Sequence, residues 1–415
     1  MTERRYKTIT ECRICGGKTL DVLMDLGEQA LNGVFPERPG EMKKGPTTLV
    51  KCREPAGCGL VQLGQTYNLD LMYGENYGYR SGLNKSMISH LSSKVAAIEA
   101  FLPLKPSDLV VDIGSNDATT LKAYSQKELK LVGVDPSGAK FANYYPRHIS
   151  LVADFFPSSK LNKIIGSQKA RVVTSFSMFY DLENPVSFAH AVRGLLDVDG
   201  IWVFEQSYLP SMLSANSFDT VCQEHLEYYA LRQIVHILDK TDLKLIDVEF
   251  NDVNGGSFSV TAARQDSSHV PNRRSILEAM RSEDAIALGT ERPYLRFRES
   301  VKLQKGKLVS FLQRARENGE TVMGLGASTK GNVLLQHFEI DSEILSAIGE
   351  VNQDKIGRFT PGSDIPIIAE DEVLKKRPDY ILVLPWHFRQ FFCKSPKFRG
   401  LKLVFPLPEF EIVEL

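Results

Sequence analysis

No stretch of this 415-residue sequence approaches the roughly 18 consecutive apolar residues that a membrane-spanning helix requires. The N-terminal residues MTERRYKTIT also lack the apolar segment of a secretory signal. An excess of one charge is absent too, because 50 lysines and arginines face 51 acidic residues and leave a net charge of −1. These absences predict a soluble, cytoplasmic protein that binds neither membranes nor nucleic acids through a basic surface.

Cysteine is scarce, and six cysteines in a chain of this length do not suggest a disulfide framework. Four of them form two pairs near the N-terminus, Cys12 with Cys15 and Cys52 with Cys58. Two such pairs are typical of one tetrahedral zinc site whose four thiolates leave no open position for catalysis. We therefore expect a structural zinc. A nucleic-acid-reading zinc module is the main alternative, and the lack of local basic residues counts against it.

The GxGxxG motif of nicotinamide-cofactor sites is missing as well. Instead, an apolar run at 109–113 leads into the turn GSND, and a second apolar run ends at Asp135. Polar and acidic groups at the carboxyl ends of parallel strands suit a ribose and a cationic amino acid better than a pyrophosphate. We predict an S-adenosylmethionine site, with a nicotinamide site as the alternative. Its candidate residues are Asp112, Gly114, Asn116, Asp117 and Asp135.

Strand and helix patterns alternate from 108 to about 262, which indicates an α/β domain with a mainly parallel sheet. Seven strands are expected, at 109–113, 130–135, 149–153, 170–176, 200–205, 243–250 and 257–263, and the last two suit an antiparallel pair at a sheet edge. This is the sheet usual in methyltransferases. Asp154 and Phe155 follow the third strand, where they suit adenine, and Ser175 begins a segment expected to border the methyl donor.

A cluster of carboxylates, tyrosines and one histidine occupies residues 218–229. No clean apolar stripe explains it, and Glu224 beside His225 favours a general base over a structural histidine. Upstream, the stretch YGENYGYRSG at 73–82 contains Tyr77 and Tyr79, which suit contacts with a sugar or a sulfonium. A packed linker explains that stretch equally well. Asn254 lies in a glycine turn that allows close approach to a substrate.

The C-terminal third begins with a charged helical bridge at 265–318 and a second strand–glycine–helix unit at 321–332. Its hydroxyl, lysine and amide groups, Ser328, Lys330 and Asn332, suit a diphosphate. Further strands are expected at 345–349, 379–384 and 402–405, and carboxyl-end residues should line the same cleft: Glu350, His387 and Arg389. A regulatory domain without a ligand is the alternative.

Taken together, the motifs CxxC, CGLVQL, YGYRSG, VDIGSND, EHLEYY, GGS and GASTKGN resemble those of sugar C-methyltransferases that act on nucleotide-linked deoxyhexoses. The resemblance implies a zinc-binding domain at 1–80 and a methyltransferase domain at 81–265 with a seven-stranded Rossmann-like sheet. It also implies a Rossmann-like domain at 266–415 that binds the sugar nucleotide. The expected protein is a monomer or a small homo-oligomer.

The implied reaction is methylation of the third ring carbon of a 4-keto-6-deoxyhexose linked to GDP or dTDP, with release of S-adenosylhomocysteine. In this family the histidine of the EH pair is the proposed base, which matches His225, with Glu224 beside it and Tyr79 as a further catalytic candidate. The zinc is expected to lie remote from this step. O- or N-methylation of a nucleotide sugar and a binding protein without activity are the alternatives.

Two positions depart from the family pattern. Cys222 stands where many relatives have tyrosine, and Tyr180 stands nearest the place of a histidine. We expect both to line the sugar site and to alter its wall.

Overall fold

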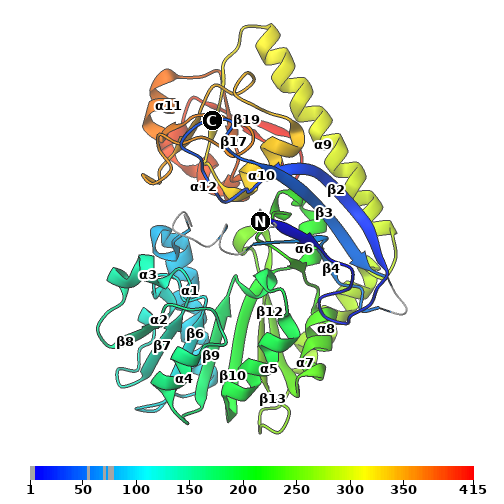
Figure 1. Cartoon of the computed structure of the whole chain (residues 1–415). Coiled ribbons are helices and arrows are strands. Elements are labelled where there is room, and N and C mark those ends of the chain that lie inside the picture. The colour runs from blue at the N-terminus through cyan, green and yellow to red at the C-terminus, as the bar shows by residue number, and fades with distance from the viewer. Residues whose placement is uncertain (1–4, 54–56, 69–71, 73–78) are drawn as a thin grey trace.

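The central part of the chain forms a doubly wound sheet of seven strands (Figure 1). The computed structural model describes residues 5–53, 57–68, 72 and 79–415, and every strand expected in the central region is present. Across the sheet the strands follow the order β12 (Leu243–Asn251), β13 (Ser257–Arg264), β10 (Leu196–Ser207), β9 (Ala170–Phe176), β6 (Leu109–Ile113), β7 (Lys130–Val134) and β8 (Ile149–Val152). Neighbours pair in parallel except β13, which is antiparallel to β10 and β12. The order reverses between β6 and β9, where doubly wound sheets bind ligands.

Side chains of these strands alternate between two cores, one on each face of the sheet. Val110 of β6 packs in one core with Ile98 of α1 (Lys85–Phe101). Val111, the next residue, packs in the other core with side chains of α5 (Pro185–Leu195) and α7 (Leu231–Lys240). With both faces covered, the ligand-binding surface is restricted to the loops at the strand ends.

The N-terminal region contributes a smaller antiparallel sheet that also contains a strand from the central region. Its order is β11 (Glu227–Tyr228), β4 (Val61–Leu63), β3 (Lys44–Cys52) and β2 (Leu20–Ala30). Nearby, β1 (Tyr6–Thr8) pairs with β5 (Gln65–Tyr67). Because β11 lies in the EHLEYY stretch, the N-terminal sheet is completed by residues far beyond 1–80. The region at 1–80 is thus a unit in sequence but not in hydrogen bonding.

A six-stranded sheet organises the C-terminal region in the order β16 (Ile367–Ala369), β15 (Ile348–Glu350), β14 (Val322–Leu325), β17 (Tyr380–Val383), β18 (Lys402–Phe405) and β19 (Glu411–Glu414). All pairs are parallel except β18 with β19, so the region is Rossmann-like. The strand expected at 345–349 is the shorter β15, and α10 (Thr329–Phe338) follows the glycine turn as expected.

The long helix α9 (Arg292–Glu317) connects the regions along one side of the molecule (Figure 1). Its buried stripe, which includes Tyr294 and Phe297, shares a core with the N-terminal strands and the C-terminal sheet. Lys51 of β3 lies over the ring of Tyr294, 5.0 Å from its centroid. The helical segment at 265–318 therefore packs on both neighbours. No helix among the described residues is long and apolar enough to cross a membrane.

Candidate functional site

Four thiols from two turns meet in the N-terminal region. The Sγ atoms of Cys12, Cys15, Cys52 and Cys58 all lie within 4.8 Å of one another, and none forms a disulfide. The Sγ atoms of Cys12 and Cys58 are 3.5 Å apart, as are those of Cys15 and Cys52. Four ligands at a Zn–S distance of about 2.3 Å around a tetrahedral ion have S···S distances of roughly 3.8 Å, so the thiols fit zinc. All four positions are then filled by protein, and the zinc is structural.

The turn after β6 provides the backbone geometry for a cofactor site. Gly114 has φ +76°, and a Cβ there would lie 2.9 Å from Cγ of Met178, so the turn requires glycine. The Gly114 amide donates to the Val134 carbonyl at 2.8 Å, and the Asn116 amide donates to Oδ2 of Asp135 at 2.9 Å. The turn is thereby fixed against the carboxyl end of β7, with a buried carboxylate at the edge.

The segment that contains Tyr79 lies over this turn. Amides of Ser81 and Gly82 donate to the side chains of Asn116 and Asp117, each at 3.0 Å. The Asn116 side-chain amide donates to the Tyr79 carbonyl at 3.2 Å, and the Tyr79 side chain is 48% exposed. The segment at 79–82 and the turn after β6, 35 residues apart in the sequence, thus lie together at the carboxyl edge of the sheet. Tyr77, also expected here, lies outside the described residues.

The other cofactor candidates divide between the edge and the interior. Phe155, which follows β8, is 45% exposed and presents an aromatic face, and Asp154 beside it accepts from the Ser158 hydroxyl at 2.8 Å. Ser175, by contrast, is fully buried, and its hydroxyl accepts from the indole of Trp202 at 2.9 Å. The Ser175 hydroxyl is therefore used within the core, and that this residue borders the cofactor stays a prediction.

Asp112 is a second buried member of this set. Its carboxylate accepts from the Thr174 hydroxyl at 2.5 Å, across the boundary between β6 and β9. Burial raises the pKa of Asp112 to about 7. Asp112 therefore joins the two strands at the switch point beneath the cofactor turn.

His225 is held by backbone groups in a defined orientation. Its Nδ1 lies 2.8 Å from the Thr220 carbonyl oxygen, so Nδ1–H donates and Nε2 is left to accept. The Tyr180 ring packs edge-on against the imidazole at 4.6 Å between centroids, and the Tyr180 carbonyl accepts from the Leu226 amide. Burial, reinforced by the charge of Lys330, lowers the pKa of His225 to about 4. The ring is therefore neutral at physiological pH.

Glu224 does not hydrogen-bond the imidazole. Its carboxylate, the Cys222 thiol and a ring nitrogen of His225 lie within 4.8 Å of one another, and a Cβ on Gly33 would overlap with the Glu224 carboxylate. Burial raises the pKa of Glu224 to about 7, against the opposing effect of Lys355. The thiol of Cys222 has its pKa raised by burial, so it is neutral. The tautomer of His225 is therefore set by the Thr220 carbonyl and not by the neighbouring acid.

Two lysines from the C-terminal region approach the same cluster. Lys330, at the start of α10, donates to the Asn254 carbonyl at 2.7 Å, and Ser328 caps the same helix by accepting from the Gly331 amide. Lys355 donates to the Ala327 carbonyl at 2.9 Å. Burial lowers the pKa of both lysines. Two half-buried cations thus lie near His225 and Glu224 where three parts of the chain meet.

The loop after β17 closes this junction. The indole of Trp386 donates to the buried Asp219 at 2.7 Å, which joins the C-terminal region to the segment that precedes His225. Burial, then the charge of Lys330, lowers the pKa of His387 to about 3, and its Nδ1 is buried without a hydrogen-bond partner among the described residues. His387 is therefore a neutral imidazole at this junction, close enough to Lys330 for its pKa to respond to that charge.

Three residues that were expected to bind the substrate form contacts with other protein groups instead. Asn332 donates to the Asn32 carbonyl at 2.8 Å, and Glu350 accepts from the amides of Val351 and Asn352. Arg389 forms a two-pronged pair with Glu411 at 2.9 and 2.8 Å, so its guanidinium is not directed at the cluster.

Conversely, the cluster includes residues that the sequence did not single out: Gly33, Asp219, Thr220, Lys355 and Trp386. Asp219 and Thr220 fall within the recognised 218–229 stretch, whereas Lys355 follows no recognisable motif.

Comparison with known protein families matches most of the chain. Residues 12–73 match a model described as "Putative zinc binding domain". Residues 86–248 match "Methyltransferase domain", and residues 252–408 match "C-methyltransferase C-terminal domain". The C-methyltransferase NovU of Streptomyces niveus is 27% identical over 98% of this chain and 97% of its own.

Solved structures resemble the chain only weakly. A chain of the Haloferax volcanii complex of the Trm112 methyltransferase activator with a methyltransferase is 14% identical. The match covers 44% of this chain and 94% of that one, with a TM-score of 0.38. An S-adenosylmethionine-dependent methyltransferase from Clostridium acetobutylicum is 12% identical over 43% of this chain and 92% of its own, with a TM-score of 0.34.

Proposed function

The chain is an S-adenosylmethionine-dependent C-methyltransferase of the three-domain, zinc-binding type, and from that premise we propose that it methylates a nucleotide sugar. The proposed acceptor is the third ring carbon of a 4-keto-6-deoxyhexose linked to GDP or dTDP. The keto group of such a sugar acidifies the proton on the adjacent carbon, so a base in the protein can remove it.

His225 is the proposed base. Its Nδ1–H is directed at the Thr220 carbonyl, and its lowered pKa keeps Nε2 unprotonated at neutral pH and free to accept the sugar proton. The C–H bond breaks, its electron pair forms the enolate, and the proton rests on Nε2 until solvent takes it. This oriented, neutral imidazole with two half-buried lysines nearby is the observation that supports the proposal most strongly.

Negative charge then develops on the sugar's keto oxygen. Lys330 and Lys355 provide cations near the cluster, and Glu224, with a pKa near 7, can hold or donate a proton there. Charge stabilisation by preorganised groups in a dry site is usually the largest contribution to catalysis. We assign Lys330 and Lys355 to the enolate and the diphosphate, and Tyr79, Tyr180, Cys222 and Asn254 to the walls around the sugar.

The cofactor residues follow from the carboxyl edge of the central sheet. When bound, S-adenosylmethionine supplies an electrophilic methyl group on its sulfonium. We propose that Asp135 accepts from the ribose hydroxyls, that Asn116 and Asp117 face the amino-acid end, and that Phe155 stacks on adenine. The carboxylates of Asp117 and Asp135 accept hydrogen bonds, and the exposed rings of Tyr79 and Phe155 offer aromatic faces, a combination that fits this molecule.

The test is a substrate screen with mass spectrometry. GDP- and dTDP-linked 4-keto-6-deoxyhexoses are each incubated with enzyme and S-adenosylmethionine, and sugar mass and S-adenosylhomocysteine are measured. The proposal expects one sugar to gain a methyl group with matching S-adenosylhomocysteine. A methylated product whose third carbon keeps its proton would favour O- or N-methylation, and absence of turnover with every sugar would contradict the proposal.

A further inference from the structure

Arg13 occupies an unusual position on the first zinc turn. It directly follows the zinc ligand Cys12, yet its side chain is only 3% exposed. Its Nε lies 3.7 Å from a carboxylate oxygen of Glu227, whose side chain is fully buried. A buried guanidinium requires several acceptors, because its donors lose their water.

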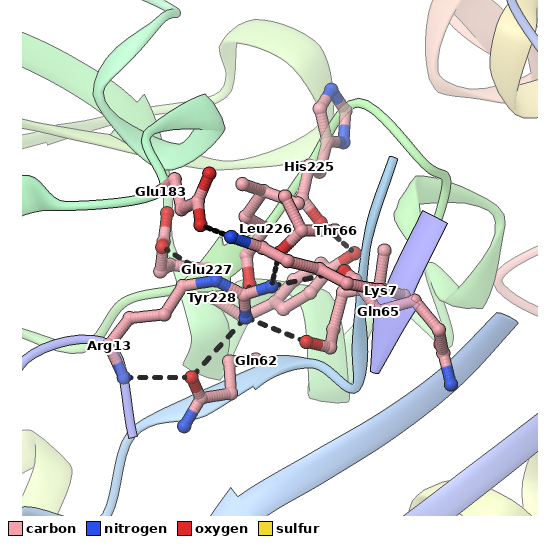
Figure 2. Close-up of polar contacts among 11 residues, drawn as sticks. Lys7, Arg13, Gln62, Gln65, Thr66, Glu183, His225, Leu226, Glu227 and Tyr228 are labelled. Carbon is pink, nitrogen blue, oxygen red and sulfur yellow. Dashed lines mark hydrogen bonds and ion pairs between the residues drawn. The ribbon is translucent and has the colours of Figure 1, made fainter. Parts of the chain in front are cut away.

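The acceptors come from two segments that the guanidinium joins. Nη1 donates to the Leu63 carbonyl at 2.6 Å and to the Leu226 carbonyl at 3.4 Å. Nη2 donates to the Gln65 carbonyl at 3.0 Å and to the Thr66 hydroxyl at 2.9 Å. Figure 2 shows these contacts on one side of the segment and the His225 ring on the other.

Leu226 and Glu227 directly follow His225, and backbone hydrogen bonds also hold them. The Leu226 carbonyl accepts from the Leu63 amide at 2.8 Å, and the two-residue strand β11 pairs with β4. A two-residue strand contributes few ladder hydrogen bonds, and the contacts of Arg13 with the Leu226 carbonyl and the Glu227 carboxylate add to them. The first zinc turn is therefore linked through Arg13 to the segment that follows the proposed base.

We propose that Arg13 is a positioning residue through which the zinc turn sets the location of His225. The zinc ligands Cys12 and Cys15 lie on either side of Arg13 in the sequence, so the metal fixes the backbone from which this side chain extends. The guanidinium then holds the backbone that follows the base. The proposal rests on the proposed role of His225, but the coupling itself is a property of the fold.

Arg13→Gln tests the proposal, and Arg53→Gln is the matched control. Arg53 also directly follows a zinc ligand, Cys52, but its side chain is 60% exposed and pairs with Asp21. Amide hydrogen exchange followed by mass spectrometry reports the 222–229 and 109–113 segments separately. Zinc content, S-adenosylmethionine affinity, kcat and the KM for the sugar complete the comparison.

Arg13→Gln is expected to speed exchange in 222–229 at least tenfold and to leave 109–113, the zinc content and cofactor affinity within twofold of wild type. Its kcat should fall ten- to a hundredfold with a smaller change in KM, since displacement of a catalytic group by about 1 Å costs on that order. Arg53→Gln should change none of these. Arg13→Lys keeps the positive charge but lacks the planar guanidinium with its several N–H donors, so it should show the same changes to a smaller degree.

Wild-type exchange and kcat in Arg13→Gln would overturn the proposal. Equal loss of protection in 109–113 would do so as well, because it indicates a general folding role. If Arg13→Gln does not fold, Arg13→Lys becomes the test. Wild-type exchange in 222–229 and wild-type kcat in that variant would overturn the proposal. Faster exchange in 222–229 in a protein that methylates no sugar would instead contradict the proposed function and leave the coupling intact.

Discussion

At the scale of single residues, the environment of His225 defines what it can do. The sequence predicted the histidine and its acidic neighbour, because two titratable residues outside any apolar stripe are best explained by chemistry. It could not predict that the Thr220 carbonyl orients the ring, since that contact depends on the backbone path of the 3₁₀ turn Phe218–Thr220. Lys355 was likewise not predictable, because only tertiary packing brings it to Glu224.

The base assignment predicts a specific defect in His225→Ala. Loss of a positioned acid–base group costs about 10²–10⁴-fold in rate, or roughly 3–5 kcal/mol. Turnover should fall on that scale while calorimetry finds nearly unchanged S-adenosylmethionine affinity. His190→Ala, at an exposed histidine of α5, is the control and should match wild type. Full turnover in His225→Ala would transfer the role to Glu224 or Tyr79.

The protonation state of His225 is itself measurable. Burial and the Lys330 charge disfavour the imidazolium, so its pKa is lowered from 6.5 to about 4. The ring should therefore stay neutral as pH falls through 6.5 and titrate only near 4. NMR of the histidine ring resonances, assigned with His225→Ala, measures this directly. In Lys330→Met the pKa should rise because a nearby cation is removed, and titration near 6.5 in the wild type would contradict the account.

At the scale of elements, strands were predicted more reliably than the side chains they present. The apolar runs at 109–113, 170–176 and 402–405 match β6, β9 and β18 in both bounds. The direction of the Ser175 side chain was harder to predict than its strand. Side chains alternate along β9, and that of Ser175 is directed at Trp202 and not at the loops. The two-residue β11 could not be predicted, since the strand it pairs with, β4, comes much earlier in the chain.

The carboxyl edge of the sheet predicts the effect of Asp135→Ala. Hydrogen bonds from ribose hydroxyls to a carboxylate contribute about 1.5–3 kcal/mol, so S-adenosylmethionine should bind roughly 10- to 150-fold more weakly. Calorimetry measures this, and Asp108→Ala, before the amino end of β6, is the control. Equal affinity in Asp135→Ala and wild type would place the ribose elsewhere.

At the scale of the whole molecule, the proposed site is built where the three regions meet. The central sheet supplies the cofactor edge and His225, the N-terminal region supplies Gly33 and Arg13, and the C-terminal region supplies Lys330 and Lys355. The order of motifs predicted these three regions. Their packing could not be predicted, because β11 and the Asp219–Trp386 contact are long-range.

The zinc centre predicts one bound metal ion per chain. Metal analysis of protein purified without chelator should give a zinc stoichiometry near one. Cys15→Ala should lower it and reduce thermal stability, because the four thiolates hold a region with little core of its own. Cys393→Ala, at a cysteine outside the cluster, is the control and should retain zinc. Zinc-free wild-type protein would contradict the assignment.

The central claim is that the protein removes a proton from the sugar carbon before that carbon is methylated. The most direct measurement is proton NMR of a nucleotide-linked 4-keto-6-deoxyhexose in D₂O with wild-type enzyme and S-adenosylhomocysteine, which fills the cofactor site but donates no methyl group. The account predicts that the proton on the third ring carbon exchanges for deuterium at least as fast as turnover, and that His225→Ala abolishes the exchange. Retention of that proton by the wild type, on a sugar that it methylates, would contradict the claim.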